Sequence, residues 1–154
     1  MTEANPFPPS DADRHAIWEM LVRRDSDFFL SGDWSIVADD YVSEGFLGIE
    51  CALSLNPDDW RPAYPDVEAY RDAAVAARWD RENFAEELRP AWIRCQTLPR
   101  IDIAGDRALA HKRIDGRIQR KDDDPLVLAW RSVFHLRRED RTWKISGFTG
   151  YLPL

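Results

Sequence analysis

The spacing of apolar residues changes from a helical to a strand period along the chain. From residue 10 to residue 31, apolar side chains recur every three or four positions, which predicts an amphipathic helix with one buried face. A short helix is expected after Asp33 and a third helix after Asp66, because aspartate is a favoured N-cap residue. Residues 1–9, which include three prolines, are predicted to form a disordered tail before a single domain at 10–154.

Alternation of apolar and polar residues predicts the strands. A first strand is expected at 44–53, and four more at 93–104, 107–119, 126–138 and 142–152. Residues 54–66 form a proline-rich loop that contains Trp60, and a loop of this length is typical of a lid or a binding loop. Because the helices come first and most strands follow, the chain is expected to have an α+β architecture.

The turns determine which side chains share a face of the sheet, because directly opposed residues point the same way. The face predicted to lie inside is apolar with few interruptions, so the helices must cover it. It holds Ile93, Cys95, Thr97, Ile101, Ile103, Ala108, Ala110, Lys112, Ile114, Gly116, Ile118, Leu126, Leu128, Trp130, Ser132, Phe134, Leu136, Trp143, Ile145, Gly147, Thr149 and Tyr151. On the polar outer face, Leu109, Val127, Val133 and Phe148 indicate either a homodimer interface or scattered surface residues.

Four segments together resemble a known family. They are Phe28–Trp34 at the end of the first helix, Tyr41–Phe46, the hairpin Ile101–Ala108, and the ending from Trp143 to Tyr151. On these residues the chain resembles the nuclear transport factor 2-like superfamily, in its SnoaL-like branch. The resemblance implies a cone-like, curved antiparallel sheet wrapped around three N-terminal helices. It also implies a cavity between sheet and helices, and dimers that form through the sheets.

Composition excludes several classes of partner. A net charge of −7 argues against a protein that binds the phosphate backbone of nucleic acids. No apolar run approaches the ~20 residues needed to cross a membrane. Because the first residues lack the features of a signal peptide and the chain has two cysteines, a cytoplasmic protein is expected. The three histidines form no metal-binding motif, so neither a metal nor another cofactor is expected.

Aromatic side chains make up 12% of the residues, with seven tryptophans among them. This content predicts an aromatic-lined cavity for a small hydrophobic molecule, with ordinary core packing as the alternative use. The residues expected to line the cavity are Trp18, Phe29, Tyr41, Ile49, Trp60, Trp130, Phe134 and Tyr151.

Asp25 lies in the middle of the apolar stripe of the first helix, between Leu21 and Phe28. A buried carboxylate without a partner is costly, so Asp25 is expected either to be paired or to serve as an acid or base in the cavity. Lys112 carries the one charge on the inner face of its strand. It is the counter-ion of Asp25, a cation for an acidic ligand, or a side chain that reaches out to the cavity rim.

The resemblance adds roles for individual positions. Similar ketosteroid isomerases carry their two oxyanion-stabilising groups where this chain has Asp25 and Ser132, although Ser132 also suits a small core residue. The isomerase base falls on Ile49, which cannot abstract a proton. Arg113 and Asp115 are similar to the Arg-x-Asp pair of limonene epoxide hydrolases, but their parity predicts an exposed ion pair.

Three functions follow from these observations and from the resemblance. The first is an enzyme without a cofactor, a lyase, isomerase or hydrolase acting on a hydrophobic ring-bearing substrate. In it Asp25 is the acid or base, and Tyr41, Ser132 or Lys112 is its polar partner. The second is a non-catalytic ligand-binding or dimerisation module. The third is the small subunit of a ring-hydroxylating dioxygenase, a protein that shares this fold.

Overall fold

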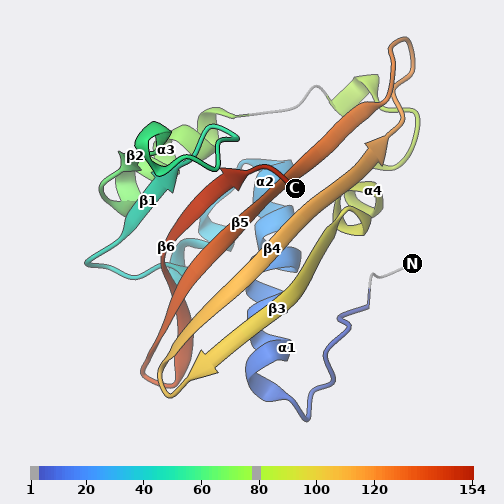
Figure 1. Ribbon diagram of the computed structural model, residues 1–154. Helices are drawn as coiled ribbons and strands as arrows, with labels where there is room; N and C mark the ends of the chain where they lie inside the picture. The colour runs from blue at the N-terminus through green and yellow to red at the C-terminus, as the bar shows by residue number, and fades with distance from the viewer. Residues whose placement is uncertain (1–3, 78–80) are drawn as a thin grey trace.

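A single mixed sheet of six strands organises the molecule. The computed structural model describes residues 4–77 and 81–154. The strands lie in the order β2-β1-β6-β5-β4-β3 (Figure 1). Their bounds are β1 Leu47–Glu50, β2 Arg61–Tyr64, β3 Gln96–Ala104, β4 Arg107–Ile118, β5 Leu126–Glu139 and β6 Thr142–Leu152. The α+β prediction is confirmed, but β1 pairs with β6 in parallel, so the sheet is not wholly antiparallel.

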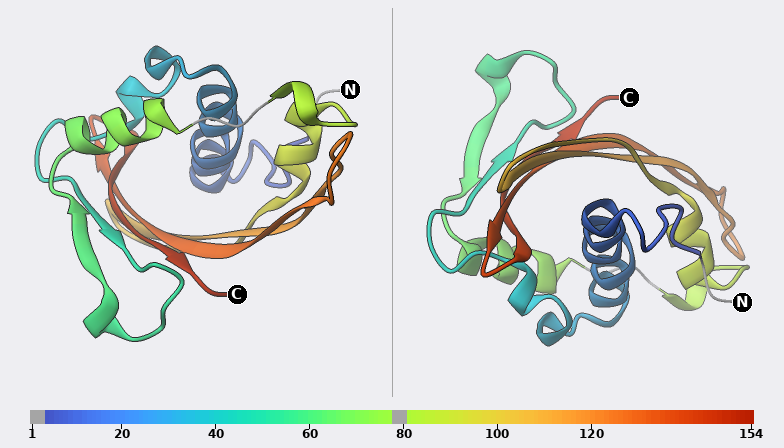
Figure 2. Two further views of the ribbon diagram at one scale, coloured as in Figure 1. Left: turned by 90° about the horizontal axis from the view of Figure 1, so that it is seen from above. Right: turned by 90° about the horizontal axis from the view of Figure 1, so that it is seen from below.

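The first helical segment runs without a break from Ala12 to Ser31. It consists of α1 (Ala12–Trp18), a π-helical turn (Glu19–Arg24) and α2 (Asp25–Ser31). It lies on the concave side of the sheet, between α3 (Val67–Ala76) and α4 (Leu88–Arg94) (Figure 2). Where a short helix is expected after Asp33, the structure has two 3-10 turns. Two further 3-10 turns lie later in the described chain. These turns are Trp34–Ile36, Ala38–Asp40, Pro57–Asp59 and Arg81–Asn83.

Two β-bulges bend the sheet along one line across the strands. On β3, the pair Leu98–Pro99 stands opposite Lys112 of β4 alone. On β5, Ser132 is paired directly with Lys112 and stands opposite the pair Gly150–Tyr151 of β6. Because a bulge bends its strand and increases the local twist, the sheet bends on both sides of Lys112 and Ser132. These two polar side chains therefore lie next to each other on its concave face.

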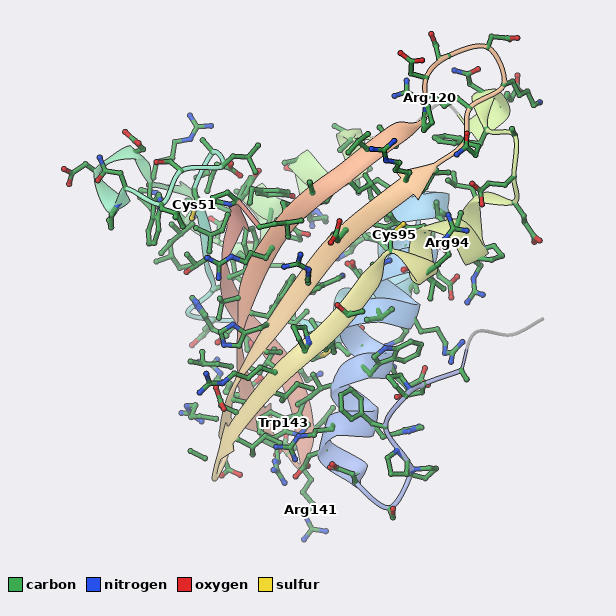
Figure 3. The ribbon with its side chains drawn as sticks, turned by 45° about the vertical axis from the view of Figure 1, so that its right-hand side comes forward. Cys51, Arg94, Cys95, Arg120, Arg141 and Trp143 are labelled. Atoms are coloured by element: carbon green, nitrogen blue, oxygen red, sulfur yellow. The ribbon has the colours of Figure 1, made fainter. Side chains whose placement is uncertain are left out.

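The narrow end of the cone is closed by contacts between the first helix and the hairpin of β5 and β6. Trp143 is buried there, beside the start of α1 (Figure 3). Its indole Nε1 donates a hydrogen bond to the carboxylate of Asp13 at 3.1 Å. The guanidinium of Arg138 stacks over the indole at 4.5 Å from the ring centroid. This closed end leaves space for a cavity only farther along the sheet.

The predicted inner faces of β4 and β5 are confirmed, because side chains assigned to them are buried; Ala110, Lys112 and Leu136 are examples. The prediction for Phe148 is wrong, because this side chain is buried inside the molecule. Ser146 is an extra residue of β6 in the pairing with β5. The residues of β6 after Ser146 therefore point to the face opposite to the one that simple alternation predicts, and Phe148 points inward.

Three other segments differ from their predicted structure. Ile93 and Cys95 belong to α4 and its C-terminal cap, not to a strand. Strand β1 covers four residues of the expected 44–53, and the loop at 54–66 contains β2. In the part of the expected tail that is described, Asn5 and Phe7 make hydrogen bonds to residues of the first helix; residues 1–3 lie outside the described residues. No helix among the described residues is long and apolar enough to span a membrane.

Gly147 provides a test of how β1 joins the sheet. A Cβ atom at this position would lie 2.2 Å from the carbonyl oxygen of Leu47, which is backbone of the neighbouring parallel strand. The substitution Gly147→Ala must therefore separate β1 from β6. It is expected to lower the free energy of unfolding by about 3 kcal/mol, as measured by urea denaturation.

Gly105 is the matched control, because a Cβ atom there meets no atom within 4 Å. Its φ of +60° is left-handed, a conformation that asparagine tolerates. Gly105→Asn is expected to change the free energy of unfolding by less than about 1 kcal/mol. Equal effects of the two substitutions would contradict the close approach of β1 to β6.

Candidate functional site

A cavity of about 300 Å³ lies between the helices and the concave face of the sheet. Aromatic rings supply most of its wall, and three alanines of α3 and its C-cap leave room on one side. The lining residues are Asp25, Phe28, Phe29, Tyr64, Tyr70, Ala73, Ala74, Ala77, Trp92, Lys112, Ile114, Trp130, Ser132, Phe134, Phe148 and Tyr151. Cavities of this size hold small organic ligands, and such walls suit a planar apolar ring.

Asp25 and Lys112 form an ion pair at the wall of this cavity. The Lys112 Nζ donates to Asp25 Oδ2 at 3.0 Å and to the carbonyl oxygen of Leu21 at 2.5 Å. The Lys112 side chain is 3% exposed, whereas the Asp25 side chain is 26% exposed. Among the described residues no hydrogen-bond partner is found for Asp25 Oδ1. The carboxylate is therefore fixed through Oδ2, and Asp25 lines the cavity.

The π-helical turn explains why Lys112 can reach the helix backbone. In a continued α-helix, the N–H of Asp25 would donate to the carbonyl of Leu21, four residues earlier. Here it donates to the carbonyl of Val22 instead, and the Leu21 carbonyl accepts a hydrogen bond from Lys112 Nζ. Single π-helical turns inside α-helices occur frequently at functional sites. The turn therefore positions both oxygen atoms that bind Lys112 Nζ.

Ser132 lies beside Lys112 and stabilises the bulge of β6. Its Oγ accepts a hydrogen bond from the backbone N–H of Tyr151 at 3.3 Å. Tyr151 has a φ of +63°, a strained conformation for a residue with a side chain. The bulge turns the Tyr151 ring toward the cavity wall. Because the oxygen of Ser132 is the acceptor, its hydroxyl hydrogen remains able to donate to a ligand.

Tyrosine hydroxyls around Asp25 are held in their neutral form. Burial raises the pKa of Tyr70 well above its usual range, and the negative charge of Asp25 adds to the shift. Partial burial raises the pKa of Tyr151 to about 12, although 38% of this residue is exposed. Tyr41, buried behind Tyr70, has a raised pKa for the same reason. Near neutral pH, Tyr70 and Tyr151 at the cavity wall are therefore hydrogen-bond donors.

An open groove adjoins the cavity beside β1. It is lined by Glu50, Ala52, Leu53, Tyr64, Trp130 and Tyr151. The loop after β1 borders the groove with two left-handed residues, Ala52 with a φ of +49° and Leu53 with a φ of +59°. Tyr151 of β6, on the other side of the groove, is left-handed as well. Strained residues of this kind cluster at ligand sites more often than elsewhere. The groove and the cavity share three aromatic residues, so the two hollows lie side by side.

Seven of the residues proposed from the sequence line the cavity. They are Asp25, Phe29, Lys112, Trp130, Ser132, Phe134 and Tyr151. Four others lie elsewhere. Trp18 lines a separate hollow beside the N-terminal segment, and Tyr41 packs behind the wall against Trp34 and Tyr70. Ile49 is absent from the cavity wall because neighbouring Gly48 faces the lining residues Tyr64 and Phe148, which turns Ile49 to the opposite face of β1. The Trp60 indole donates to the carbonyl of Ser54, within its own loop.

Sequence reasoning missed several lining residues, notably Tyr64, Tyr70, Trp92 and Phe148. Tyr70 shares a helix face with Ala73, Ala74 and Ala77, and this mixture of one aromatic and three small residues was the available signal. The position of Tyr64 at the cavity wall results from the pairing of β2 with β1, and alternation alone does not predict this pairing. Phe148 was missed because the bulge at Ser146 turns its side chain inward, and alternation alone does not predict a bulge.

Two other candidates for chemistry lie away from the cavity. Arg113 and Asp115 form an exposed ion pair at 3.0 Å, as their parity predicted. His135 is half-buried, and burial lowers its pKa. Its Nε2 lies 3.2 Å from Thr149 Oγ1. Among residues 4–77 and 81–154, no three His, Cys, Asp or Glu side chains are placed to hold a metal ion.

Comparison with known proteins finds similarity at the level of structure. No family model matches the chain, and no curated protein matches it in sequence. An NTF2-like protein of unknown function from Shewanella baltica superposes with a TM-score of 0.57 at 15% identity, over 96% of this chain and 97% of that chain. An NTF2-like protein with a cystatin-like fold from Novosphingobium aromaticivorans gives a TM-score of 0.59 at 14% identity, over 95% and 84% of the two chains.

A third solved structure bears an enzyme's name. It is a hexachlorocyclohexane dehydrochlorinase (LinA) Type2, which superposes with a TM-score of 0.58 at 16% identity, over 94% of this chain and 90% of that chain. These identities are low, so the similarity concerns the arrangement of helices and strands alone. On this evidence the chain has the nuclear transport factor 2-like fold.

Proposed function

We propose that this protein binds a small ring-bearing molecule in its cavity and acts on it by acid–base chemistry, with Asp25 as the base. The observation that carries the proposal is the state of this carboxylate. Lys112 fixes its Oδ2, and Asp25 lines a space whose walls are mainly aromatic. An apolar cavity with a few placed polar groups is the usual form of a small-molecule site.

The geometry supports removal of a proton from carbon. Asp25 Oδ1 accepts the proton, and the electron pair of the broken C–H bond forms a new double bond in the substrate. In an isomerisation the charge moves to a carbonyl oxygen of the substrate, and in an elimination it departs with a leaving group. Ser132 of the sheet and Tyr70 of α3 both line the cavity as donors and stabilise that developing negative charge.

Similarity of fold gives limited support to this reaction class. The dehydrochlorinase with this fold is named for the loss of hydrogen chloride from a ring compound. An elimination from a cyclic substrate is therefore one form of the proposed chemistry.

A second candidate function is a ligand-binding module without catalysis. The observation in its favour is that Lys112 Nζ binds both the Leu21 carbonyl and Asp25, and so links the first helix to the sheet. In this alternative the ion pair serves the fold, and a ligand is held without chemical change.

Hydrogen exchange in a carbon acid tests the proposed base. A bicyclic ketone such as tetralone fits the size and polarity of the cavity. In deuterium oxide, the protein is expected to accelerate exchange of the acidic protons of this ketone, as followed by NMR. Asp25→Asn removes the basic carboxylate and keeps its shape, so the accelerated exchange should fall by about 100-fold.

Asp27→Asn is the matched control, because Asp27 lies on the same helix and pairs with Arg89 at 2.7 Å. It is absent from the cavity wall and is expected to leave the exchange rate unchanged. Asp25→Asn/Lys112→Met removes both charges and provides a second test without a buried unpaired ammonium. Exchange at the wild-type rate in either Asp25 variant would show that Asp25 is not the base.

A double-mutant cycle measures how far the ion pair stabilises the fold. Lys112→Met leaves the partly buried Asp25 carboxylate without its partner, so the free energy of unfolding should fall by about 2–3 kcal/mol. The double variant with Asp25→Asn should lose at least about 1 kcal/mol less than the sum of the single losses. Lys121→Met, in an exposed turn, is the control and should change stability by less than about 0.5 kcal/mol. Additive losses would contradict a direct interaction.

Stability should fall at alkaline pH because of the tyrosines. In the folded protein the pKa of Tyr151 is about 12, and the pKa values of Tyr41 and Tyr70 are raised as well. In the unfolded chain tyrosine ionises near pH 10. Between these values the unfolded chain holds fewer protons, so the free energy of unfolding decreases as pH rises above about 10. Tyrosinate absorbance during urea unfolding measures this, and Tyr151→Phe should weaken the decrease. A flat pH dependence in this range would contradict neutral, buried hydroxyls.

A further inference from the structure

The cavity cation is a lysine in a chain that otherwise prefers arginine. Of the 21 basic residues, lysine occupies positions 112, 121 and 144, and arginine occupies all the others. Arginine is the usual residue for buried ion pairs with carboxylates, because its planar guanidinium binds them at two points. At Asp27 and Asp40 this chain does use arginine, from Arg89 and Arg24.

Lysine differs from arginine in one chemical property that matters here. Its ammonium can lose a proton and become a nucleophilic amine, whereas the guanidinium of arginine stays protonated in proteins. Catalytic lysines that bind carbonyl substrates are buried and desolvated. Lys112 has this environment, with 3% exposure and a place in the wall of the aromatic cavity.

We propose that Lys112 forms a reversible imine with a ring-bearing aldehyde or ketone held in the cavity. This inference rests on the proposed binding of a ring-bearing molecule and adds a covalent step to it. Two of the three ammonium protons point to Leu21 O and Asp25 Oδ2. On another side the Nζ lies 5.8 Å from the ring centroid of Phe134, which lines the cavity.

Asp25 supplies the proton transfers that the step requires. It first takes a proton from the Lys112 ammonium across the 3.0 Å hydrogen bond. The amine attacks the carbonyl carbon, so the C–N bond forms while the carbonyl π electrons move to oxygen. That oxygen takes up the second amine proton and becomes a hydroxyl. Asp25 returns its proton to the hydroxyl, water leaves, and a protonated imine remains beside the Asp25 carboxylate. No oxidant or further reactant is needed.

Reductive trapping tests this step. The protein is incubated with naphthaldehyde and sodium cyanoborohydride, and the modified residue is located by peptide mapping with mass spectrometry. Lys112 is expected to be labelled about 100-fold faster than Lys121, which lies in an exposed turn and reports on background labelling. Lys112→Arg keeps the positive charge and should lose this labelling. Asp25→Asn should slow it by about 100-fold, since its proton transfers are lost.

Naphthalenemethanol separates this inference from the proposed function, because it has the same ring and no carbonyl group. Its binding is followed by the change in tryptophan fluorescence, to which Trp92 and Trp130 at the cavity wall are expected to contribute most. Binding of the alcohol without faster labelling of Lys112 would overturn the imine and leave the proposed ligand class standing. Failure of the alcohol to bind, together with background labelling of Lys112, would overturn both. Faster labelling that persists in Asp25→Asn would contradict the part given to Asp25.

Discussion

The ion pair between Lys112 and Asp25 is the interaction on which the site depends. It connects the centre of the curved sheet to the middle of the first helix, beside a core cluster of apolar side chains. Removing two charges from water is costly unless each finds close partners. The π-helical turn provides such a partner, because its Leu21 carbonyl accepts a hydrogen bond from the lysine. The same pair fixes Oδ2 of Asp25, which lines the cavity, so stability and chemistry share one contact.

The curvature of the sheet explains why there is a cavity beside this pair. Bulges on β3 and β6 flank Lys112 and Ser132, and they bend the sheet at this level. Near Trp143 the sheet and the first helix pack closely. Small residues of α3, such as Ala73 and Ala74, leave the remaining space between rings unfilled. The aromatic content of the chain is therefore divided between core packing, as at Trp143, and the wall of one cavity.

The sequence allowed much of the fold and part of the site to be predicted. The strands β4 and β5 are long and alternate regularly, so alternation was enough to place Lys112, Ser132 and Phe134 on one inner face. Helical spacing placed Asp25 opposite them. Bulges were not predictable, because an extra residue in one strand depends on its partner strand and not on local alternation. That is why Phe148 was assigned to the wrong face. The π-helical turn and the inward position of Tyr64 also depend on contacts between distant segments.

A ligand bound as proposed has its ring in the cavity, beside the Asp25 carboxylate. Intermolecular nuclear Overhauser effects between bound naphthalenemethanol and side-chain methyl groups test this placement. Contacts of the ligand ring are expected with the methyl groups of Ala74, Ala77 and Ile114, which line the cavity. Contacts confined to Leu109 and Val127, which are exposed on the outer face of the sheet, would contradict it.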